Sequence, residues 1–153
     1  MTGMEKAAFL YAEDDPDDQL LAEMAHRESG APDPLTFVND GAEVLEYLRR
    51  TGRYSHRADK TSPSIVLLDL NMPGIDGRET LRLMRADKDL RRIPVVILTT
   101  SAAEQDIGAS YEAGANAYIV KPSDFGGLVR IFSSLSDFWF KVSSLAKVES
   151  SDE

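Results

Sequence analysis

Short runs of apolar residues alternate along the chain with longer stretches in which apolar residues recur at helical spacing. The central run, residues 65–68, has no polar interruption, as expected for a parallel strand that helices cover on both faces. Further strands are predicted at residues 7–12, 35–38, 95–99 and 117–120, and helices at 17–28, from Gly41, and at 77–86, 102–113 and 124–142. Five strand–helix alternations predict an α/β domain, a doubly wound parallel sheet with helices on both faces.

The predicted helices differ in how firmly large side chains anchor them. In the first helix, Leu20, Leu21 and Met24 recur at helical spacing. The fourth helix is rich in alanine and has few large side chains besides Ile107 and Tyr111, so it can shift at low cost. Between the second helix and the central strand, residues 51–63 form a long polar connection, which we predict to be the least ordered internal segment.

The two ends of the chain are predicted to lie outside the folded domain. We expect residues 1–6 to be a flexible lead and residues 7–142 to form a single domain. Residues 143–153 are rich in serine and acidic residues, which predicts a disordered tail.

Composition narrows the possible classes of protein. The chain has 17 basic and 26 acidic residues, a net charge of -9, and phosphate contacts require clustered Lys and Arg, so we expect no nucleic-acid partner. The scattered basic residues between positions 49 and 60 are interpreted as a solvated loop. The absence of cysteine excludes disulfides, thiolate catalysis and zinc–thiolate sites. Without an apolar run of about 20 residues or a signal peptide, the protein is predicted to be cytoplasmic, without membrane contact.

Carboxylates end two of the predicted strands. Asp69 follows the central run, and Glu13 and Asp14 follow the first strand. In open α/β sheets the carboxyl ends of the strands form the edge where ligands bind, so these three residues are expected to meet. Their mutual repulsion is tolerable when a cation lies among them. Oxygen ligands without His or Cys favour Mg²⁺ or Mn²⁺.

Other polar residues near these positions have simpler interpretations. Asp15, Asp17 and Asp18 are expected to stabilise the N-terminus of the following helix, because carboxylates cap helices and complement the helix dipole. His26 and His56 have no motif partner and are interpreted as surface residues.

Four motifs, AEDDPDD, LLDLNMPGIDG, ILTTS and AYIVKP, occur in this order. Together they resemble the receiver domain of bacterial two-component response regulators, over residues 7–140. The resemblance implies a flavodoxin-like sheet with strand order 2-1-3-4-5. It also implies a protein that accepts a phosphoryl group from a sensor histidine kinase, as an output protein or a phosphorelay intermediate. Such a protein is not an enzyme beyond catalysing its own phosphorylation and dephosphorylation.

The resemblance implies that Asp69 is the phosphoacceptor, a nucleophile that attacks phosphorus to give an aspartyl phosphate. It further implies that Asp14 and Asp69 bind the metal directly, that the backbone carbonyl of Asn71 adds a ligand, and that Glu13 acts partly through water. The implied cofactor is Mg²⁺ or Mn²⁺.

Two further strand ends match phosphoryl-binding positions of the family, namely Thr99 and Lys121. Thr100 adjoins Thr99, but alternation along a strand sends the two side chains to opposite faces, and we assign the role to Thr99. Tyr118 matches the aromatic position that turns inward when Thr99 moves toward a phosphoryl group, so these two residues are the predicted switch.

The remaining family positions concern the geometry and lifetime of the phosphorylated state. Pro122 matches a proline that follows a cis peptide bond, which would aim the preceding lysine into the site. Asn71 and Ser101 match positions that influence how water reaches the acyl phosphate, so they are predicted to tune dephosphorylation.

Three consecutive aromatic residues, Phe138, Trp139 and Phe140, lie in the last predicted helix and cannot all face one side of it. We therefore predict a homodimer contact at this helix end, the alternative being that Phe140 packs under the tail. The aromatic helix end, the long loop after Arg50 and the absence of an output domain resemble single-domain regulators paired with phytochrome kinases. The predicted kinase is accordingly a bacteriophytochrome.

Two other functions would use similar residues. Phosphotransferases of the haloacid-dehalogenase type also combine a strand-end aspartate with Mg²⁺, but they need a second aspartate two residues later as general acid. Here that position is Asn71, an amide that cannot transfer the proton. An interaction module independent of phosphorylation would be favoured by the loss of Asp69, Asp14 or Lys121, and all three are present.

Overall fold

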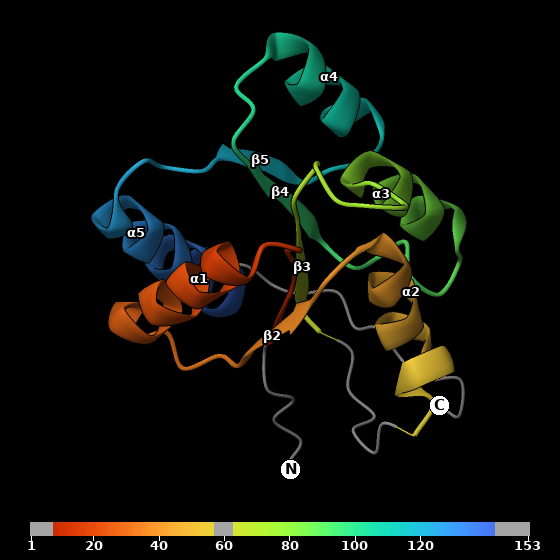
Figure 1. Ribbon diagram of the computed structural model, residues 1–153, viewed down its shortest axis with the longest axis horizontal. Helices are drawn as coiled ribbons and strands as arrows, with labels where there is room; N and C mark the ends of the chain where they lie inside the picture. The colour runs from red at the N-terminus through yellow and green to blue at the C-terminus, as the bar shows by residue number, and fades with distance from the viewer. Residues whose placement is uncertain (1–7, 57–62, 143–153) are drawn as a thin grey trace.

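The computed structural model describes residues 8–56 and 63–142, which form alternating strands and helices (Figure 1). The predicted lead and tail lie outside the described residues, as does the centre of the polar connection, residues 57–62. None of the helices in this part of the chain has the length and hydrophobicity needed to cross a bilayer. In chain order the elements are β1 (Phe9–Ala12), α1 (Pro16–Ser29), β2 (Leu35–Val38), α2 (Gly41–Arg49), the 3-10 turn η1 (Gly52–Tyr54), β3 (Ile65–Leu68), α3 (Gly77–Ala86), β4 (Val95–Thr99), α4 (Glu104–Glu112), β5 (Ala117–Val120), α5 (Phe125–Ser136) and the π-helical segment η2 (Asp137–Val142).

The five strands form one parallel sheet in the order β2-β1-β3-β4-β5. Phe9 of β1 lies opposite Leu35 of β2 on one side and opposite Ile65 of β3 on the other. This topology confirms the predicted fold, and it brings the carboxyl ends of β1, β3, β4 and β5 to one edge of the sheet.

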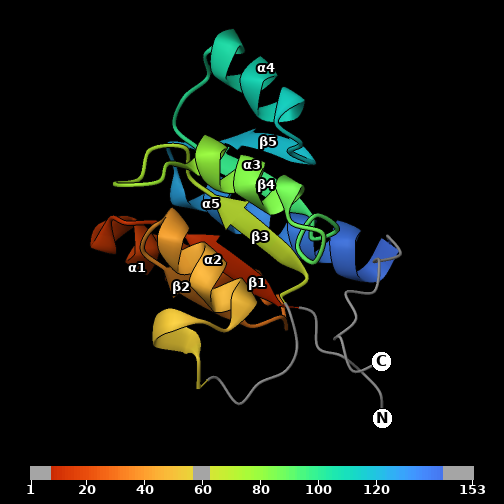
Figure 2. The same cartoon turned by 90° about the vertical axis from the view of Figure 1, so that its right-hand side faces the viewer.

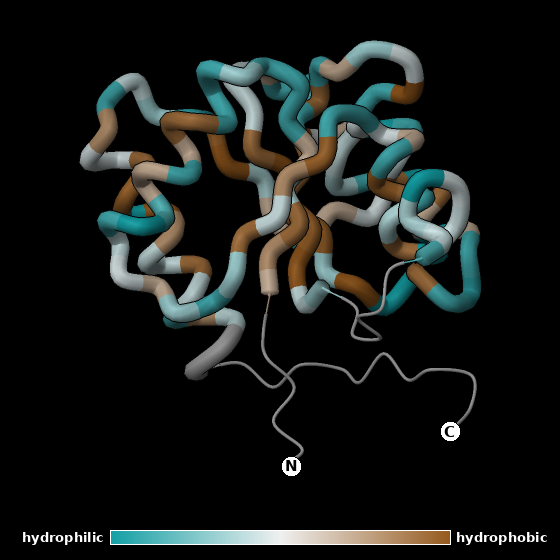
Figure 3. Tube along the Cα trace, turned by 60° about the horizontal axis from the view of Figure 1, so that its bottom comes forward, coloured by the Kyte–Doolittle hydropathy of each residue, from teal (hydrophilic) through white to brown (hydrophobic). Residues whose placement is uncertain are grey.

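Helices cover both faces of this sheet. Helices α1 and α5 pack together on one face, and α2 and α3 pack together on the other; Figure 2 looks onto α2 and α3 with the sheet behind them. Hydrophobic residues concentrate on the central strands and hydrophilic ones on the outer helices (Figure 3). Every residue of β3 and β4 is buried, which explains why these strands are unbroken apolar runs.

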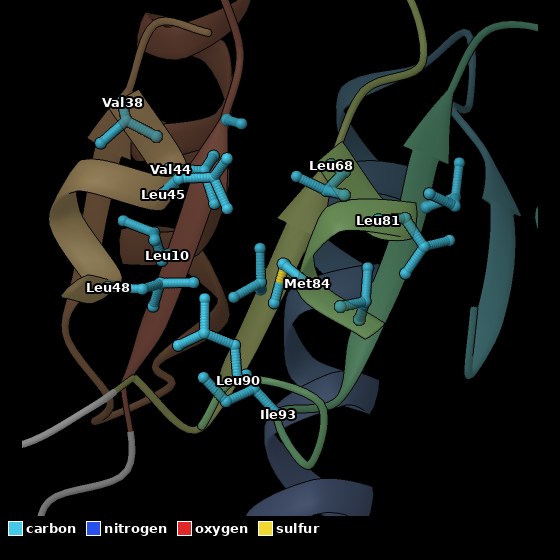
Figure 4. Packing of buried hydrophobic residues seen from close by; sticks show 14 of the residues in the cluster. Leu10, Val38, Val44, Leu45, Leu48, Leu68, Leu81, Met84, Leu90 and Ile93 are labelled. Atoms are coloured by element: carbon cyan, nitrogen blue, oxygen red, sulfur yellow. The ribbon is translucent and has the colours of Figure 1, made fainter. Parts of the chain in front are cut away.

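Alternate residues along each strand supply two separate apolar clusters. On the α2 and α3 face, Leu81 and Met84 of α3 pack against strand residues such as Leu10 and Leu68 (Figure 4). The opposite cluster lies under α1 and α5 and contains the large aromatic residues Phe9, Tyr11 and Phe132. With both faces covered, only the two ends of the strands remain open for chemistry.

Helix α1 contacts the core through its small residues. Ala22 and Ala25 are buried, whereas Leu20, Leu21 and Met24 are 55%, 47% and 46% exposed. The large apolar side chains that define the helical spacing therefore lie on the outer surface of α1. A helix that packs through alanine can approach its neighbours closely, and α1 packs along α5.

Helices α4 and α5 are shorter than predicted. Helix α4 runs from Glu104 to Glu112, and Ala103 at its N-cap makes no side-chain capping hydrogen bond. Helix α5 ends at Ser136, and the chain continues as π-helix to Val142, so the prediction of one α-helix to residue 142 is wrong. The wider turn changes the direction in which the aromatic residues project.

His26 is half-buried, so its interpretation as a surface residue is wrong, whereas His56 is exposed as expected. The His26 ring lies edge-on to Phe9 and Phe132, with ring centroids 6.0 and 5.5 Å away. Its Nε2 atom lies 2.6 Å from the carbonyl oxygen of Asp33, whose carboxylate accepts a 2.6 Å hydrogen bond from Ser136. These contacts join α1 to the end of α5.

Candidate functional site

Four strands place polar side chains at the carboxyl edge of the sheet. Glu13 follows β1, Asp69 follows β3, Thr99 ends β4 and Lys121 follows β5. Glu13, Asp69 and Thr99 are almost fully buried, with exposed fractions of 1%, 6% and 0%. This is the edge at which open α/β proteins bind ligands.

Lys121 connects the carboxylates of this site. Its Nζ atom lies 2.5 Å from Glu13 Oε1 and 2.7 Å from Asp69 Oδ2. Thr99 Oγ1 donates a 2.9 Å hydrogen bond to the other oxygen, Asp69 Oδ1. Both oxygens of Asp69 are thus held by the two residues that the family resemblance assigns to phosphoryl binding.

The loop between β3 and α3 also shapes the surroundings of Asp69. The backbone N–H of Asn71 donates to Asp69 Oδ1 at 3.0 Å. A Cβ atom at Gly77 would lie 2.4 Å from the carbonyl oxygen of Asp69, so only glycine lets α3 begin this close to the site. Burial would raise the pKa of Asp69, but hydrogen bonds from Lys121 and Asn71 outweigh it and hold the pKa below its usual value. Asp69 is therefore ionised at neutral pH.

Glu13 and Lys121 balance each other's charge within the buried site. Burial raises the pKa of Glu13, against the lowering effect of its hydrogen bond with Lys121. Burial alone would lower the pKa of Lys121, but contacts with the carboxylates of Asp69 and Glu13 raise it above its usual value. The lysine is consequently a protonated cation among acidic groups.

The donor atoms at this edge fit a hard divalent cation, because Glu13, Asp14 and Asp69 offer carboxylate oxygens and Asn71 offers a carbonyl. Within residues 8–56 and 63–142, however, no three carboxylate or imidazole groups converge as a metal cage. The Lys121 ammonium lies between Glu13 and Asp69, and Asp14 is exposed. The oxygen ligands thus suit Mg²⁺ or Mn²⁺. In this structure the Lys121 ammonium balances the negative charges of Glu13 and Asp69.

The acidic residues after Asp14 stabilise the start of α1, as predicted. Asp15 is the N-cap, and its Oδ1 atom accepts a 2.8 Å hydrogen bond from the backbone N–H of Asp17. Asp17 and Asp18 lie in the first turn, where negative charge complements the helix dipole. Asp18 also lies 3.6 Å from the Lys121 ammonium, a contact that no spacing along the chain indicated.

The predicted switch residues lie on neighbouring strands. Thr99 is buried and Thr100 is exposed, as alternation along β4 requires. Tyr118 is half-buried, and its hydroxyl donates a 2.8 Å hydrogen bond to the carbonyl oxygen of Ser101 in the loop that leads to α4. The tyrosine ring therefore connects β5 to the segment that follows Thr99.

Ser101 has a structural partner that the sequence did not indicate. Its hydroxyl donates to Asp106 Oδ2 at 2.6 Å, and Arg78 of α3 lies 3.3 Å from the other oxygen of Asp106. These contacts hold the first turn of α4 to α3. The three residues come from separate segments without a common motif, so no sequence pattern links them.

The prediction of a cis peptide bond before Pro122 is wrong in this structure, where no described peptide bond is cis. The trans form of a bond before proline is favoured by about 0.5–1 kcal/mol. Lys121 is instead aimed by the β-ladder, since its backbone N–H donates to the Thr99 carbonyl at 2.7 Å. The ammonium reaches both carboxylates with the trans bond.

An apolar groove of about 620 Å³ lies along β5, α5 and the aromatic end of the helix. Its lining includes Ile119, Val120 and Ile131, together with Phe138 and Trp139. The rings of Phe138 and Trp139 are 4.8 Å apart and nearly perpendicular, and Phe138 is 51% exposed. The third residue of the predicted dimer surface, Phe140, has its side chain outside the described part of the structure.

Comparisons with known proteins give a consistent result. The family of response regulator receiver domains matches residues 9–133. The response regulator Rcp1 of Synechocystis sp. is 35% identical over 136 residues, which span 89% of this chain and 90% of Rcp1, and its Mn²⁺-bound crystal structure aligns with a TM-score of 0.80. The phosphorylated cyanobacterial phytochrome response regulator RcpA is 36% identical, covers 94% of this chain and 100% of its own, and aligns with a TM-score of 0.83. RPA3017, a response regulator in red light signaling of R. palustris, is 38% identical, with coverages of 92% and 99% and a TM-score of 0.86.

Proposed function

This chain belongs to the response regulator receiver family of two-component signal transduction, and we propose that it accepts a phosphoryl group on Asp69 from a sensor histidine kinase. Receiver domains are phosphorylated on an aspartate. One observation carries the assignment to Asp69: one oxygen of this buried carboxylate accepts a 2.9 Å hydrogen bond from the Thr99 hydroxyl, and the other accepts a 2.7 Å hydrogen bond from the Lys121 ammonium. The phosphatase alternative is not favoured, since Asn71 replaces the required acid.

The reaction follows from this geometry. An oxygen of Asp69 attacks phosphorus in line with the donor's imidazole nitrogen, so that a P–O bond forms as the P–N bond breaks. The electron pair of the P–N bond leaves on the nitrogen. Thr99 and Lys121, which hold the carboxylate beforehand, then donate to the phosphoryl oxygens of the aspartyl phosphate.

Receiver domains bind a divalent metal, and we assign it here to Mg²⁺, with Mn²⁺ as a substitute. Glu13, Asp14, Asp69 and the backbone carbonyl of Asn71 would hold it. When bound, the cation supplies positive charge beside the phosphoryl oxygens. The Mn²⁺-bound form of Rcp1 supports a divalent site in this group of proteins.

Beyond family membership, we infer that the chain catalyses its own phosphorylation and a slow hydrolysis of the product. Asn71 and Ser101 tune that hydrolysis, because they flank the path by which water reaches the acyl phosphate. The hydroxyl of Ser101 is engaged by Asp106 at 2.6 Å, so an attacking water must compete with that carboxylate for it.

The kinase partner is proposed to be a phytochrome, because the similar structures include the cyanobacterial phytochrome response regulator RcpA and the bacteriophytochrome response regulators RtBRR and AtBRR. The exposed side chains of Leu20, Leu21 and Met24 support a docking surface on α1. They lie on the helix whose first turn reaches the phosphorylation site. An apolar surface in this position would let a kinase bring its phosphohistidine to Asp69.

Docking can be separated from chemistry by the choice of donor. Leu20→Glu should slow phosphotransfer from the phosphorylated kinase about tenfold, equivalent to about 1.4 kcal/mol, because a charge would be desolvated in the contact. Phosphorylation by acetyl phosphate should stay unchanged. The matched control is Tyr111→Glu, because Tyr111 is a similarly exposed large side chain, at 49%, and lies on α4. A Leu20→Glu protein that accepts phosphate from the kinase at the wild-type rate would show that α1 is not the docking surface.

We further propose that the protein forms a homodimer through Phe138, Trp139 and Phe140. The groove beside them and the 51% exposure of Phe138 support this assignment, because a hollow and a projecting ring on one surface can complement a second copy. Sedimentation of the wild type and of Trp139→Ala tests it. A wild type that sediments as a monomer, with or without phosphodonor, would exclude the dimer.

Phosphorylation is proposed to reach this surface through Thr99 and Tyr118. A phosphoryl dianion on Asp69 gives the Thr99 hydroxyl a phosphoryl oxygen as its acceptor in place of the carboxylate. The Tyr118 hydroxyl connects β5 to the loop before α4 through its hydrogen bond. Tyr118→Phe, which removes only that hydroxyl, should leave phosphorylation intact and reduce the effect of phosphorylation on dimer affinity. We expect no nucleic-acid or membrane partner and a cytoplasmic location, which the acidic, cysteine-free composition supports.

The partner assignment is tested by profiling phosphotransfer from each sensor kinase of the same genome. We expect a phytochrome kinase to transfer fastest, with no transfer to Asp69→Asn. Rapid transfer from a different kinase class would refute the phytochrome assignment and leave the role of Asp69 intact.

A further inference from the structure

Gln19, in the first turn of α1, bridges two loops through its side-chain amide. Its Nε2 atom lies 2.5 Å from the main-chain carbonyl oxygen of Glu13 and 3.0 Å from Asn39 Oδ1. A main-chain carbonyl can only accept a hydrogen bond, so the atom of Gln19 that faces Glu13 is the nitrogen. The atom of Asn39 that faces this nitrogen is then its oxygen, and both amide orientations are determined by the contacts.

The two acceptors belong to neighbouring loops at the carboxyl edge of the sheet. Glu13 follows β1, and Asn39 follows β2. The same loops are joined by a 3.0 Å hydrogen bond from the Glu13 N–H to the carbonyl oxygen of Val38. Gln19 therefore holds the main chain of Glu13 from the carbonyl side, and the end of β2 holds it from the N–H side.

Asn39 is in turn supported from α2. Its backbone N–H donates to Glu43 Oε1 at 3.2 Å. Although Glu43 carries a charge, its side chain is only 5% exposed, and it accepts a 2.6 Å hydrogen bond from Arg53 and a 3.0 Å one from the hydroxyl of Tyr54. The acceptor on which Gln19 rests is consequently part of a buried polar network that extends to η1.

The segment that Gln19 holds is short and carries two carboxylates of the site. Only residues 13–15 separate β1 from α1, and Glu13 and Asp14 are two of them. Like charges that close together repel, so a cation can bind them only if the main chain keeps them in place. A hydrogen bond to the Glu13 carbonyl, directly between these side chains, restrains the backbone where that repulsion acts.

We propose that Gln19 is a positioning residue for the divalent cation, acting through the main chain of Glu13. The proposal rests on the proposed function of this edge as a metal-dependent phosphorylation site. Groups that orient metal ligands typically change metal affinity about 10- to 100-fold when they are lost. Since Gln19 holds one loop and several residues contribute ligands, we expect the lower end of that range.

The variant Gln19→Leu keeps the size of the side chain and removes both donors. Its dissociation constant for Mn²⁺, measured by calorimetry without any phosphodonor, should rise about tenfold. The rate of phosphorylation by acetyl phosphate should need more cation to saturate and should reach the wild-type maximum at saturation. Gln105→Leu is the matched control, because Gln105 is the only other glutamine, is exposed on α4 and makes no side-chain hydrogen bond to another described residue. It should bind Mn²⁺ as the wild type does.

The possible outcomes separate this inference from the proposed function. A wild type that neither binds Mn²⁺ nor becomes phosphorylated would refute the proposed function and the role of Gln19 with it. If the wild type does both and Gln19→Leu matches its Mn²⁺ affinity, the positioning role is wrong. A lower maximal rate at unchanged affinity would also overturn it.

A second variant covers the case in which Gln19→Leu melts early in chelator. Asn39→Ala removes only the second acceptor, so Gln19 keeps its bond to Glu13 but loses its support. The Mn²⁺ dissociation constant of Asn39→Ala should rise by less than about tenfold, because Gln19 keeps its bond to Glu13, and an unchanged constant would contradict the proposal.

Discussion

Replacing Lys121 by methionine tests the charge balance of the site most severely. The change keeps most of the aliphatic side chain and removes the ammonium that lies 2.5 Å from Glu13 and 2.7 Å from Asp69. Both carboxylates are almost fully buried, so neither can recover its hydration in the folded protein. The folded variant must then hold two adjacent, buried negative charges without the ammonium that balances them.

The size of the effect follows from this burial. Removing one partner of a buried ion pair typically costs about 3–5 kcal/mol. Asp69 keeps its hydrogen bonds from Thr99 and Asn71, which favours the lower end, about 3 kcal/mol. For a chain of 153 residues, each kcal/mol lowers the melting temperature by about 2–4 °C, so we expect a decrease of about 6–12 °C in chelator.

A divalent cation should reverse most of this loss. A ligand at 100 times its dissociation constant stabilises the folded state by about 2.7 kcal/mol, close to the expected deficit. Mg²⁺ should therefore raise the melting temperature of Lys121→Met at least as much as that of the wild type. The control is Lys88→Met, which removes an exposed lysine and should change neither value.

Calorimetric melting of the three proteins, each with chelator and with millimolar Mg²⁺, measures both effects. If Lys121→Met melts within about 1 °C of the wild type in chelator, the buried ion pairs do not stabilise the fold and the charge argument is refuted. A destabilised variant that Mg²⁺ does not rescue would instead contradict the metal site.

Three further predictions follow from local contacts. A Cβ atom at Gly41 would lie 2.0 Å from Thr80 Oγ1 and 2.7 Å from the carbonyl oxygen of Ile75, so Gly41→Ala should lower the unfolding free energy by about 1–3 kcal/mol in urea. Its control, Gly108→Ala in α4, meets nothing within 4 Å and should raise it by about 0.5–1 kcal/mol; equal effects of the two changes would contradict the packing. The hydroxyl of Ser110 is buried without a hydrogen-bond partner among the described residues, so Ser110→Ala should stabilise the protein by about 1 kcal/mol, and a loss of stability would show that the hydroxyl is hydrogen-bonded. Burial, reinforced by a hydrogen bond to Glu43, raises the pKa of Tyr54 to about 12, so its contribution to stability is present below about pH 10 and is lost as pH rises through about 12. In an alkaline absorbance titration, the difference in phenolate absorbance between the wild type and Tyr54→Phe reports the ionisation of Tyr54. This difference should develop near pH 12, and a difference that is complete by pH 10 would refute the assignment.

The residues at the strand ends could be predicted because physical constraints leave a direct mark on the sequence there. A strand covered on both faces must be apolar throughout, so the carboxylate that follows residues 65–68 is conspicuous. Once the alternation of strands and helices indicates a parallel sheet, Glu13, Asp69, Thr99 and Lys121 must share one edge. The contacts among these four residues follow that expectation.

The face of α1 that contacts the core could not be predicted. Helical spacing indicates which residues share one face of a helix, but it does not indicate which face packs against the sheet. Leu20, Leu21 and Met24 are half exposed, since the smaller Ala22 and Ala25 contact the core. The change from α-helix to π-helix after α5 likewise leaves no periodic signal.

Hydrogen bonds between the side chains of a helix and a loop leave even less trace in a single sequence. Gln19 and Asn39 are common polar residues, and only the fold brings one to the other. The same holds for the contact between Ser101 and Asp106, which stabilises the start of α4. In each case the interaction depends on the relative placement of two segments, which residue type and spacing do not encode.

The identity of the phosphoacceptor is tested most directly by incubating the protein with acetyl phosphate and Mg²⁺ and measuring the intact mass, followed by peptide mapping of the modified residue. We expect one phosphoryl group on Asp69, no modification of Asp69→Asn, and no modification when a chelator replaces Mg²⁺. An Asp69→Asn protein that gains the phosphoryl group as readily as the wild type, or a modified residue elsewhere in the wild type, would contradict the assignment of this site.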